Sequence, residues 1–327
     1  AVTNQAVRKS KREIKKAKKN NLKNKIIVTG CASQIDPTAF LNMSEVERII
    51  DNQLKTNEQL YKHNFTGLVD EVNGKLKRFP EAISNFNFKT RALLQIQQGC
   101  DHRCTFCIIP FGRGNSRSTP ITEVVKNCQT LVSSGHREIV LTGVDITSWG
   151  GDLEGHEQDG LGALVSAILE NTPALERLRL SSVDAVELDA KLLERVILDE
   201  RVMPHLHLSL QAGDNMILKR MKRRHTREDA ITFCHEMKAK RPDMVFGADI
   251  IAGFPTETDE MFQNSLKLVE ECQIVWLHVF PFSPRPDTPA AKMPQLSGET
   301  IRERAKLLRA AGDKVRQEWL ETQIGTT

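Results

Sequence analysis

The chain has 327 residues, of which 39% are apolar and 27% charged, so it is long enough for about two domains and a sizeable core. No run of about 18 apolar residues occurs and no signal-peptide pattern opens the chain, which argues against a membrane-spanning or secreted protein. Three of the seven cysteines crowd into one loop, an arrangement that suits metal ligation better than disulfides and indicates a reducing cytoplasm.

The first 25 residues are strongly basic. Ten Lys and Arg residues lie between Arg8 and Lys25, against a single acidic residue, Glu13. Such a run, expected here in one helix, forms either a solvated face or a patch that binds phosphates. Because aromatic residues make up only 5% of the chain, a platform for stacking single-stranded bases is not expected.

The next segments predict the remnant of a small α/β domain over residues 1–60. A short apolar strand, Ile26–Val28, runs into Cys31, and a second helix is expected over about Met43 to Lys55. From Tyr61 to about residue 89 the periodicity fades and glycine and proline recur, so residues 61–88 are interpreted as a linker.

From residue 89 to about 300 strands alternate with helices, which predicts a parallel sheet with right-handed crossovers. The expected strands are Leu93–Gln97, Glu138–Gly143, Arg177–Ser181, His205–Gln211, Val245–Ile251 and Trp276–Phe280. The expected helices are Ile121–Ser134, Leu161–Glu170, Asp189–Leu198, Arg227–Lys240 and Glu257–Cys272, with a further helix over 301–327. Six such units fall short of an eight-fold barrel, so a partial (βα)6 barrel of the α/β class is predicted.

Alternation within these strands gives each of them one polar face. In His205–Gln211 the leucines share one face, whereas His205, His207, Ser209 and Gln211 share the other. A complete barrel fills its interior with branched apolar side chains, so polar inward faces favour an open lumen that holds a polar ligand. An open sheet with one solvated face is the alternative. His205, His207 and His278 are interpreted as hydrogen-bonded interior residues rather than metal ligands.

The first barrel strand leads into a cysteine-rich loop. Cys100, Cys104 and Cys107 stand at a C-x3-C-x2-C spacing, which can hold one [4Fe–4S] cluster and leave its fourth iron without a protein ligand. S-adenosylmethionine (SAM) can chelate such an open iron. A structural zinc site would need a fourth ligand, and His102 lies between the cysteines in poor geometry for one. Cys128, Cys234 and Cys272 lie in apolar helical patterns and are expected to be buried and inert.

At Cys100–Cys107, with Phe106 before the last cysteine, the chain resembles the radical SAM superfamily. The resemblance extends over nearly the whole chain and narrows to the methylthiotransferases. Further matching stretches are residues 108–118, 141–145, 180–182, 208–213 and 249–257, and residues 28–34 look like the segment that carries the third cysteine of the family's auxiliary cluster. The family's first two N-terminal cysteines and its C-terminal RNA-binding module are not found, which suggests truncation at both ends.

Within this family, residues 1–6 and Leu141–Ile146 look most like the bacterial enzymes that act on N6-threonylcarbamoyladenosine at position 37 of tRNA. The resemblance implies transfer of a methylthio group to C2 of that adenine, with SAM and two [4Fe–4S] clusters as cofactors. The implied partners are the anticodon loop of tRNA and an electron donor such as a flavodoxin or ferredoxin. Isopentenyladenosine-37 and a ribosomal protein aspartate are alternative substrates, and a non-catalytic iron–sulfur or zinc RNA-binding module is an alternative of another class.

The residue patterns and the resemblance together assign roles to individual residues. Cys100, Cys104 and Cys107 are expected to hold the radical SAM cluster, and Cys31 the auxiliary cluster. The residues expected at SAM are Phe106, Gly143, Asp145, Ser181, Ser182, Gln211, Asp249 and Gly253. Those expected at the substrate or tRNA are Arg113, Arg117, Lys15, Lys16 and Arg223. Each set also has an interpretation without a ligand. Gly143 and Gly253 are typical of ordinary turns at strand ends, and Ser181, Ser182 and Gln211 are typical of interior polar side chains with hydrogen-bond partners in the protein.

Overall fold

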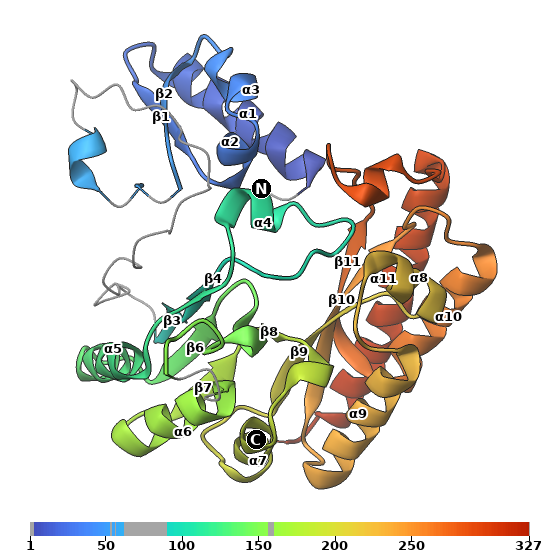
Figure 1. Cartoon of the computed structure of the whole chain (residues 1–327). Helices are drawn as coiled ribbons and strands as arrows, with labels where there is room; N and C mark the ends of the chain where they lie inside the picture. The colour runs from blue at the N-terminus through green and yellow to red at the C-terminus, as the bar shows by residue number, and fades with distance from the viewer. Residues whose placement is uncertain (1–2, 53, 56, 62–89, 156–159, 327) are drawn as a thin grey trace. The chain divides into compact units, whose positions relative to one another are not determined.

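The computed structural model describes residues 3–52, 54–55, 57–61, 90–155 and 160–326, so the predicted linker, apart from Tyr61, falls outside the described residues. The chain divides into two compact units (Figure 1). The first contains the described part of Ala1–Glu81 together with Gly99–Asn115 and Ser283–Pro289, and the second contains the rest. The cysteine loop therefore groups with the N-terminal residues rather than with the strands it connects.

The first unit is a small α/β arrangement. Its elements are α1 (Asn4–Asn20), β1 (Ile26–Thr29), α2 (Cys31–Ile35), α3 (Thr38–Leu41), β2 (Val46–Ile50), η1 (Glu58–Tyr61) and α4 (Ile109–Arg113). The Thr3 hydroxyl accepts a hydrogen bond from the Ala6 amide and so caps α1. The helix expected over Met43–Lys55 is wrong: Val46–Ile50 is a strand that pairs in parallel with β1. That pairing buries Ile49 and Ile50, which together with Val46 have the i, i+3, i+4 spacing of one helix face.

The second unit contains the strands and helices of a partial barrel. The strands are β3 (Arg91–Gln95), β4 (Gln97–Gln98), β5 (Arg117–Ser118), β6 (Glu138–Thr142), β7 (Arg177–Leu180), β8 (Ser182–Val183), β9 (His205–Gln211), β10 (Val245–Ala252) and β11 (Ile274–Pro281). The α-helices are α5 (Ile121–Ser133), α6 (Leu161–Asn171), α7 (Ala190–Leu198), α8 (Asn215–Met221), α9 (Arg227–Lys240), α10 (Asp259–Glu271) and α11 (Gly298–Thr322). Short 3-10 helices are η2 (Ile146–Ser148), η3 (Ala185–Glu187) and η4 (Pro289–Lys292).

The long strands follow one another in chain order. One parallel sheet has the order β3-β6-β7, and another has the order β8-β9-β10-β11. Only Ser181 separates β7 from β8, so the two sheets continue into each other and six parallel strand positions result. The helices α5, α6, α7 and α9 lie on the outer side of these strands (Figure 1). The predicted partial (βα)6 barrel is confirmed.

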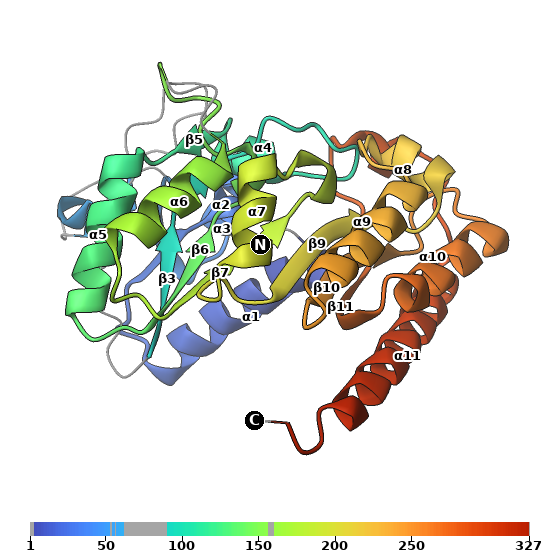
Figure 2. The ribbon, with the colours of Figure 1, turned by 90° about the horizontal axis from the view of Figure 1, so that it is seen from below.

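The core lies between the strands and these outer helices. Leu206, Leu208 and Leu210 of β9 are each almost fully buried there, as their alternation predicted. The helix α11 packs on β11 and β10 (Figure 2). Gly312 permits this close approach, because a Cβ there would lie 2.8 Å from the Cβ of Leu277. No helix among the described residues has both the length and the apolar character needed to cross a membrane.

At the start of the first strands the polar face carries an ionic cluster. The Glu138 carboxylate lies 3.0 Å from Arg179 Nε, 3.4 Å from Arg177 Nε and 3.6 Å from Arg91 Nη1. Burial raises the pKa of Glu138, but the hydrogen bonds and charges of these arginines outweigh burial and hold the pKa below its ordinary value. The polar residues of this inner face thus partly satisfy one another.

Replacing Glu138 by Gln is expected to lower the free energy of unfolding by about 1–3 kcal/mol at neutral pH, because charge-assisted hydrogen bonds are lost. A carboxyl whose folded pKa is depressed stabilises the fold above its unfolded pKa, and this contribution disappears as the pH falls through the folded pKa. The deficit of E138Q should therefore persist from neutral pH down to about pH 4.5 and shrink only as the pH falls further, as measured by urea unfolding. E176Q, which alters exposed ion pairs beside the cluster, is the matched control. Equal stability of both variants at neutral pH would contradict this assignment.

Candidate iron–sulfur and SAM site

The cysteine loop, residues 99–115, follows β4 in the chain and closes on itself. The Cys100 amide donates to the Gly114 carbonyl oxygen at 3.1 Å, so the two ends of the loop lie together. Gly99 has a φ of 76°, and a Cβ there would collide with the Asn115 carbonyl group. Glycine is therefore required at the entrance of the loop, both for its backbone angle and for this close approach.

The three cysteines of the loop differ from the other four in exposure. Cys100, Cys104 and Cys107 are partly exposed, whereas the remaining cysteines are buried, and none of them forms a disulfide. The Cys107 amide donates to the Cys104 carbonyl oxygen at 3.0 Å. Arg103 braces the loop from within, since its guanidinium donates to the Cys100 carbonyl oxygen at 2.9 Å and to Asn115 Oδ1 at 2.8 Å. Three accessible thiols on one braced loop fit a [4Fe–4S] cluster with one open iron.

Within the first unit, Cys31 lies at the start of α2 with its thiol held by two partners. Arg113 Nε lies 3.2 Å and Asn52 Nδ2 lies 3.8 Å from Cys31 Sγ. Asn52 also donates to the Gly112 carbonyl oxygen at 3.0 Å, which fixes its side chain. Burial raises the pKa of Cys31, but the hydrogen bond and charge of Arg113, with a smaller effect of Asn52, hold the pKa below the ordinary value. Arg113, expected at the substrate or tRNA, thus contacts Cys31.

In the barrel unit, Gln97 positions the turn that follows β6. Its side-chain carbonyl oxygen accepts hydrogen bonds from the amides of Val144 and Asp145, each at 2.9 Å, and its amide nitrogen donates to Ser116 Oγ at 2.9 Å. A Cβ on Gly143 would lie 2.9 Å from the same carbonyl oxygen, so glycine is needed for this approach. The Asp145 carboxylate accepts from Ser148 Oγ at 2.7 Å. Gly143 and Asp145, two of the residues expected at SAM, therefore belong to one turn that Gln97 fixes.

Other residues expected at SAM lie on the polar face of the later strands. Ser181 joins β7 to β8, and Ser182 pairs with His207 of β9. Gln211 ends β9 with a φ of 70°, a left-handed conformation that costs a non-glycine residue about 1–2 kcal/mol. Asp249 faces two histidines, with its Oδ1 atom 2.9 Å from His207 Nε2 and 3.2 Å from His278 Nδ1.

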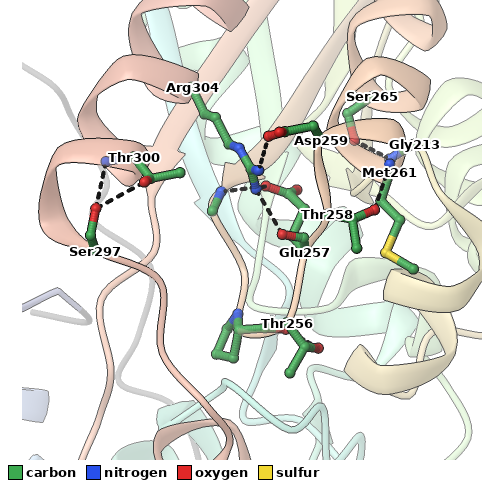
Figure 3. A network of polar contacts seen from close by, with 12 residues as sticks. Gly213, Thr256, Glu257, Thr258, Asp259, Met261, Ser265, Ser297, Thr300 and Arg304 are labelled. Carbon is green, nitrogen blue, oxygen red and sulfur yellow. Dashed lines mark hydrogen bonds and ion pairs between the residues drawn. The ribbon is translucent and has the colours of Figure 1, made fainter.

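The turn after β10 contains Gly253 and is tied to α11 through a buried ion pair (Figure 3). Glu257 Oε2 accepts from the Gly253 amide at 3.1 Å and from Arg304 Nη1 at 2.7 Å. Arg304 also donates to the Glu257 carbonyl oxygen at 3.0 Å and to Asp259 Oδ1 at 2.6 Å. Burial raises the pKa of Glu257, although Arg304 counteracts it. The Glu257 and Arg304 side chains are 1% and 7% exposed, so the pair is fully enclosed.

The basic residues expected at tRNA have different surroundings. Lys15 and Lys16 are exposed on α1. Arg117 is partly buried, and this burial lowers its pKa while the charge of Asp152 raises it. Arg223 differs from the prediction: its side chain is only 8% exposed and lies 2.6 Å from Asp184 and 2.7 Å from the Ser209 carbonyl oxygen. A buried, ion-paired guanidinium is not placed to contact RNA.

Sequence patterns did not identify several residues that organise these sites. Gln97, Asn52 and Arg304 act through partners 47 to 60 residues away in the chain. Of these three residues, only Gln97 could have been identified from the sequence, because it lies on the polar face of a predicted strand. The three remaining cysteines, Cys128, Cys234 and Cys272, are buried as predicted, and burial raises the pKa of Cys128 to about 12.

Comparisons with known proteins agree with the cysteine loop and the barrel. Residues 94–269 match the Radical SAM superfamily. The chain is 47% identical over 326 residues to the threonylcarbamoyladenosine tRNA methylthiotransferase MtaB of Rickettsia prowazekii, covering 99% of this chain and 77% of that protein. It is 34% identical to the MtaB of Aquifex aeolicus, covering 97% and 78%. It is 33% identical to the tRNA-2-methylthio-N(6)-dimethylallyladenosine synthase of Ehrlichia canis, covering 85% and 64%.

Two solved structures share the fold. The cobalamin-dependent S-adenosylmethionine radical enzyme OxsB aligns with a TM-score of 0.54 and 16% identity, over 97% of this chain and 47% of that one. The radical S-adenosylmethionine methyltransferase TsrM of Kitasatospora setae aligns with a TM-score of 0.50 and 16% identity, over 61% and 38%. At this identity the likeness concerns the fold.

Proposed function

Because the chain belongs to the radical SAM superfamily and, within it, to the threonylcarbamoyladenosine tRNA methylthiotransferases, we propose that it adds a methylthio group to C2 of N6-threonylcarbamoyladenosine at position 37 of tRNA. The similarity to methylthiotransferases over nearly the whole chain carries this proposal. The three accessible thiols of the cysteine loop, Cys100, Cys104 and Cys107, support it from the structure.

These three thiols would hold a [4Fe–4S] cluster, whose open iron binds SAM and supplies the electron that cleaves it. The chain itself braces this loop through Gly99 and Arg103. Phe106 lies in the same loop, directly before Cys107, and its proposed role is to contact the adenine of SAM. Loop residues thus both hold the metal and help to place its ligand.

The barrel would supply the remaining SAM contacts at the ends of its strands. Gln97 holds the Gly143–Asp145 turn, and Glu257 holds the Gly253 turn, so both turns are fixed in advance. Gln211 keeps a strained left-handed backbone, and such strain occurs at ligand sites more often than elsewhere. Rigid turns of this kind reduce the entropy lost when a ligand binds.

Cys31 would be one ligand of a second, auxiliary cluster that carries the sulfur to be transferred. The thiol is directed at a guanidinium and an amide, and hydrogen bonds to sulfur stabilise the thiolate form that metals require. Arg113 links this thiol to the end of the cysteine loop, within the same unit. In this proposal the enzyme binds a second cluster and receives its electrons from a flavodoxin or ferredoxin.

The proposed tRNA contact of the first unit is α1. Lys15, Lys16 and Lys19 are exposed, and the helix has no acidic residue in its first turn and Lys18 and Lys19 in its last. A helix face of this charge attracts phosphates through release of counterions. Contact with the anticodon loop would bring position 37 to the enzyme.

The proposal is tested by mass spectrometry of tRNA nucleosides from a strain that lacks the encoding gene. The methylthiolated form of threonylcarbamoyladenosine should disappear, and its unmodified precursor should accumulate. Loss of methylthiolated isopentenyladenosine instead, or of a modified ribosomal aspartate, would reassign the substrate. If the purified, cluster-loaded protein released no 5′-deoxyadenosine from SAM under reducing conditions, the enzymatic proposal itself would be wrong.

A further inference from the structure

Three neighbouring strands bring two imidazoles and a carboxylate to one point on the inner face of the barrel. His207 lies on β9, Asp249 on β10 and His278 on β11. The register places Asp249 opposite His278, and His207 opposite Gly247, two residues before Asp249 on the same face of β10. The neighbours Leu208, Ile250 and Val279 point the other way, toward the core.

The distances within this cluster are those of metal ligands. Asp249 Oδ1 lies 2.9 Å from His207 Nε2 and 3.2 Å from His278 Nδ1, and the three ligand atoms all lie within 4.8 Å of one another. Ligand atoms bonded at about 2.0–2.2 Å, at angles between 90° and the tetrahedral angle, lie about 2.8–3.6 Å apart. One ion can therefore reach all three atoms with small side-chain movements.

The backbone is adapted to this arrangement at Gly247. A Cβ at this position would lie 2.5 Å from His207 Nδ1, so only glycine leaves room for the His207 imidazole to lie over β10. The His207 ring lies 4.7 Å from that of His278, centroid to centroid. All three ligands stand on paired strands, which hold a site more accurately than loops do.

Exposure increases across the cluster from one side to the other. The side chains are 11% exposed at His207, 23% at Asp249 and 62% at His278. An ion bound here would have the buried His207 on one side and solvent on the side of His278. Three protein ligands with an open side are typical of sites that keep a water molecule as a further ligand.

We propose that His207, Asp249 and His278 bind one divalent first-row transition metal ion, independently of the cysteine loop. Two imidazoles favour such ions over magnesium or calcium, which prefer oxygen ligands. The ion would join β9, β10 and β11, the last three strands of the barrel. This revises the sequence-based interpretation of His207 and His278 as hydrogen-bonded interior residues, and that of Asp249 as a SAM contact.

The test measures zinc uptake by the protein with its iron–sulfur sites filled, so that the cysteines do not bind the probe. Wild type, H278Q and H205Q are exposed to buffered Zn²⁺ without oxygen and desalted, and zinc and iron are counted by mass spectrometry. Wild type should retain about one zinc per chain, and H278Q should bind zinc at least about tenfold more weakly. His205, on the same strand, lies 6.5 Å from His207 between ring centroids, so H205Q serves as the matched control and should bind zinc as wild type does.

A second measurement separates loss of the site from loss of the fold. Zinc should raise the unfolding temperature of wild type and H205Q and should raise that of H278Q less, since the stabilisation depends on how tightly the native state binds the ion. His278 is exposed, so its replacement should not itself prevent folding. Equal zinc uptake by wild type and H278Q, or no stoichiometric uptake by wild type, would overturn the proposal and leave a hydrogen-bonded cluster.

Discussion

Replacing Cys104 by Ala is expected to remove about four irons per chain and to abolish the cleavage of SAM. Cys104 supplies one of three thiols on a closed loop, and the four cysteines outside this loop are buried. Loss of a residue that only hydrogen-bonds to a metal ligand already weakens metal binding about 10- to 100-fold, so loss of a direct ligand should weaken it more. Iron content, visible absorbance and release of 5′-deoxyadenosine measure the effect.

The matched control for this variant is C128A. Cys128 is fully buried on α5, and burial raises the pKa of its thiol to about 12, so it is not a thiolate at neutral pH. The control should keep both its iron and its SAM cleavage. If C104A retained iron and activity equal to C128A, the loop would not hold the cluster.

Replacing Arg304 by Met is expected to lower the free energy of unfolding by about 3–5 kcal/mol, because it leaves the Glu257 carboxylate buried without its partner. The Glu257 side chain is 1% exposed, so water cannot substitute for the guanidinium. The contact with Asp259 should contribute little, since that side chain is 96% exposed. Urea unfolding followed by circular dichroism measures the change.

Two further variants distinguish an ion-pair effect from lost packing. R302M removes an exposed arginine two residues earlier on α11 and should change stability by less than about 0.5 kcal/mol. The double variant R304M/E257Q removes both charges and should recover part of the loss, because an uncharged buried amide costs less than a buried carboxylate. A double variant no more stable than R304M would show that the arginine acts by packing over Phe262, whose ring centroid lies 5.3 Å away.

The sequence predicts the strongly periodic elements of this fold well. The bounds of β9 agree with the structure to the residue, because alternating leucines mark this strand. The bounds of α9 agree as well, although its apolar residues show little helical periodicity. The Met43–Lys55 prediction failed because Val46, Ile49 and Ile50 are spaced as on a helix, while pairing with β1 decides their conformation. The very short β4, β5 and β8 carry no period that a sequence can display.

For the candidate site, spacing identified the cysteine loop but not what holds it. Three cysteines in eight residues are a local signal, whereas the hydrogen bond of Gln97 to Asp145 and that of Arg113 to Cys31 join distant residues. Arg304 is one of several arginines on α11, and nothing in its sequence context distinguishes it from Arg302. Such contacts depend on the fold as a whole, so no local pattern contains them.

The bond between Glu257 and Arg304 makes the turn after β10 and the helix α11 thermodynamically dependent on each other. A ligand that favours the ordered turn must, by reciprocity, favour the docked helix by the same free energy. Amide hydrogens near the start of α11 should then exchange more slowly when that ligand is bound, although they never touch it. Conversely, any event that loosens α11 lowers the affinity of the turn for its ligand.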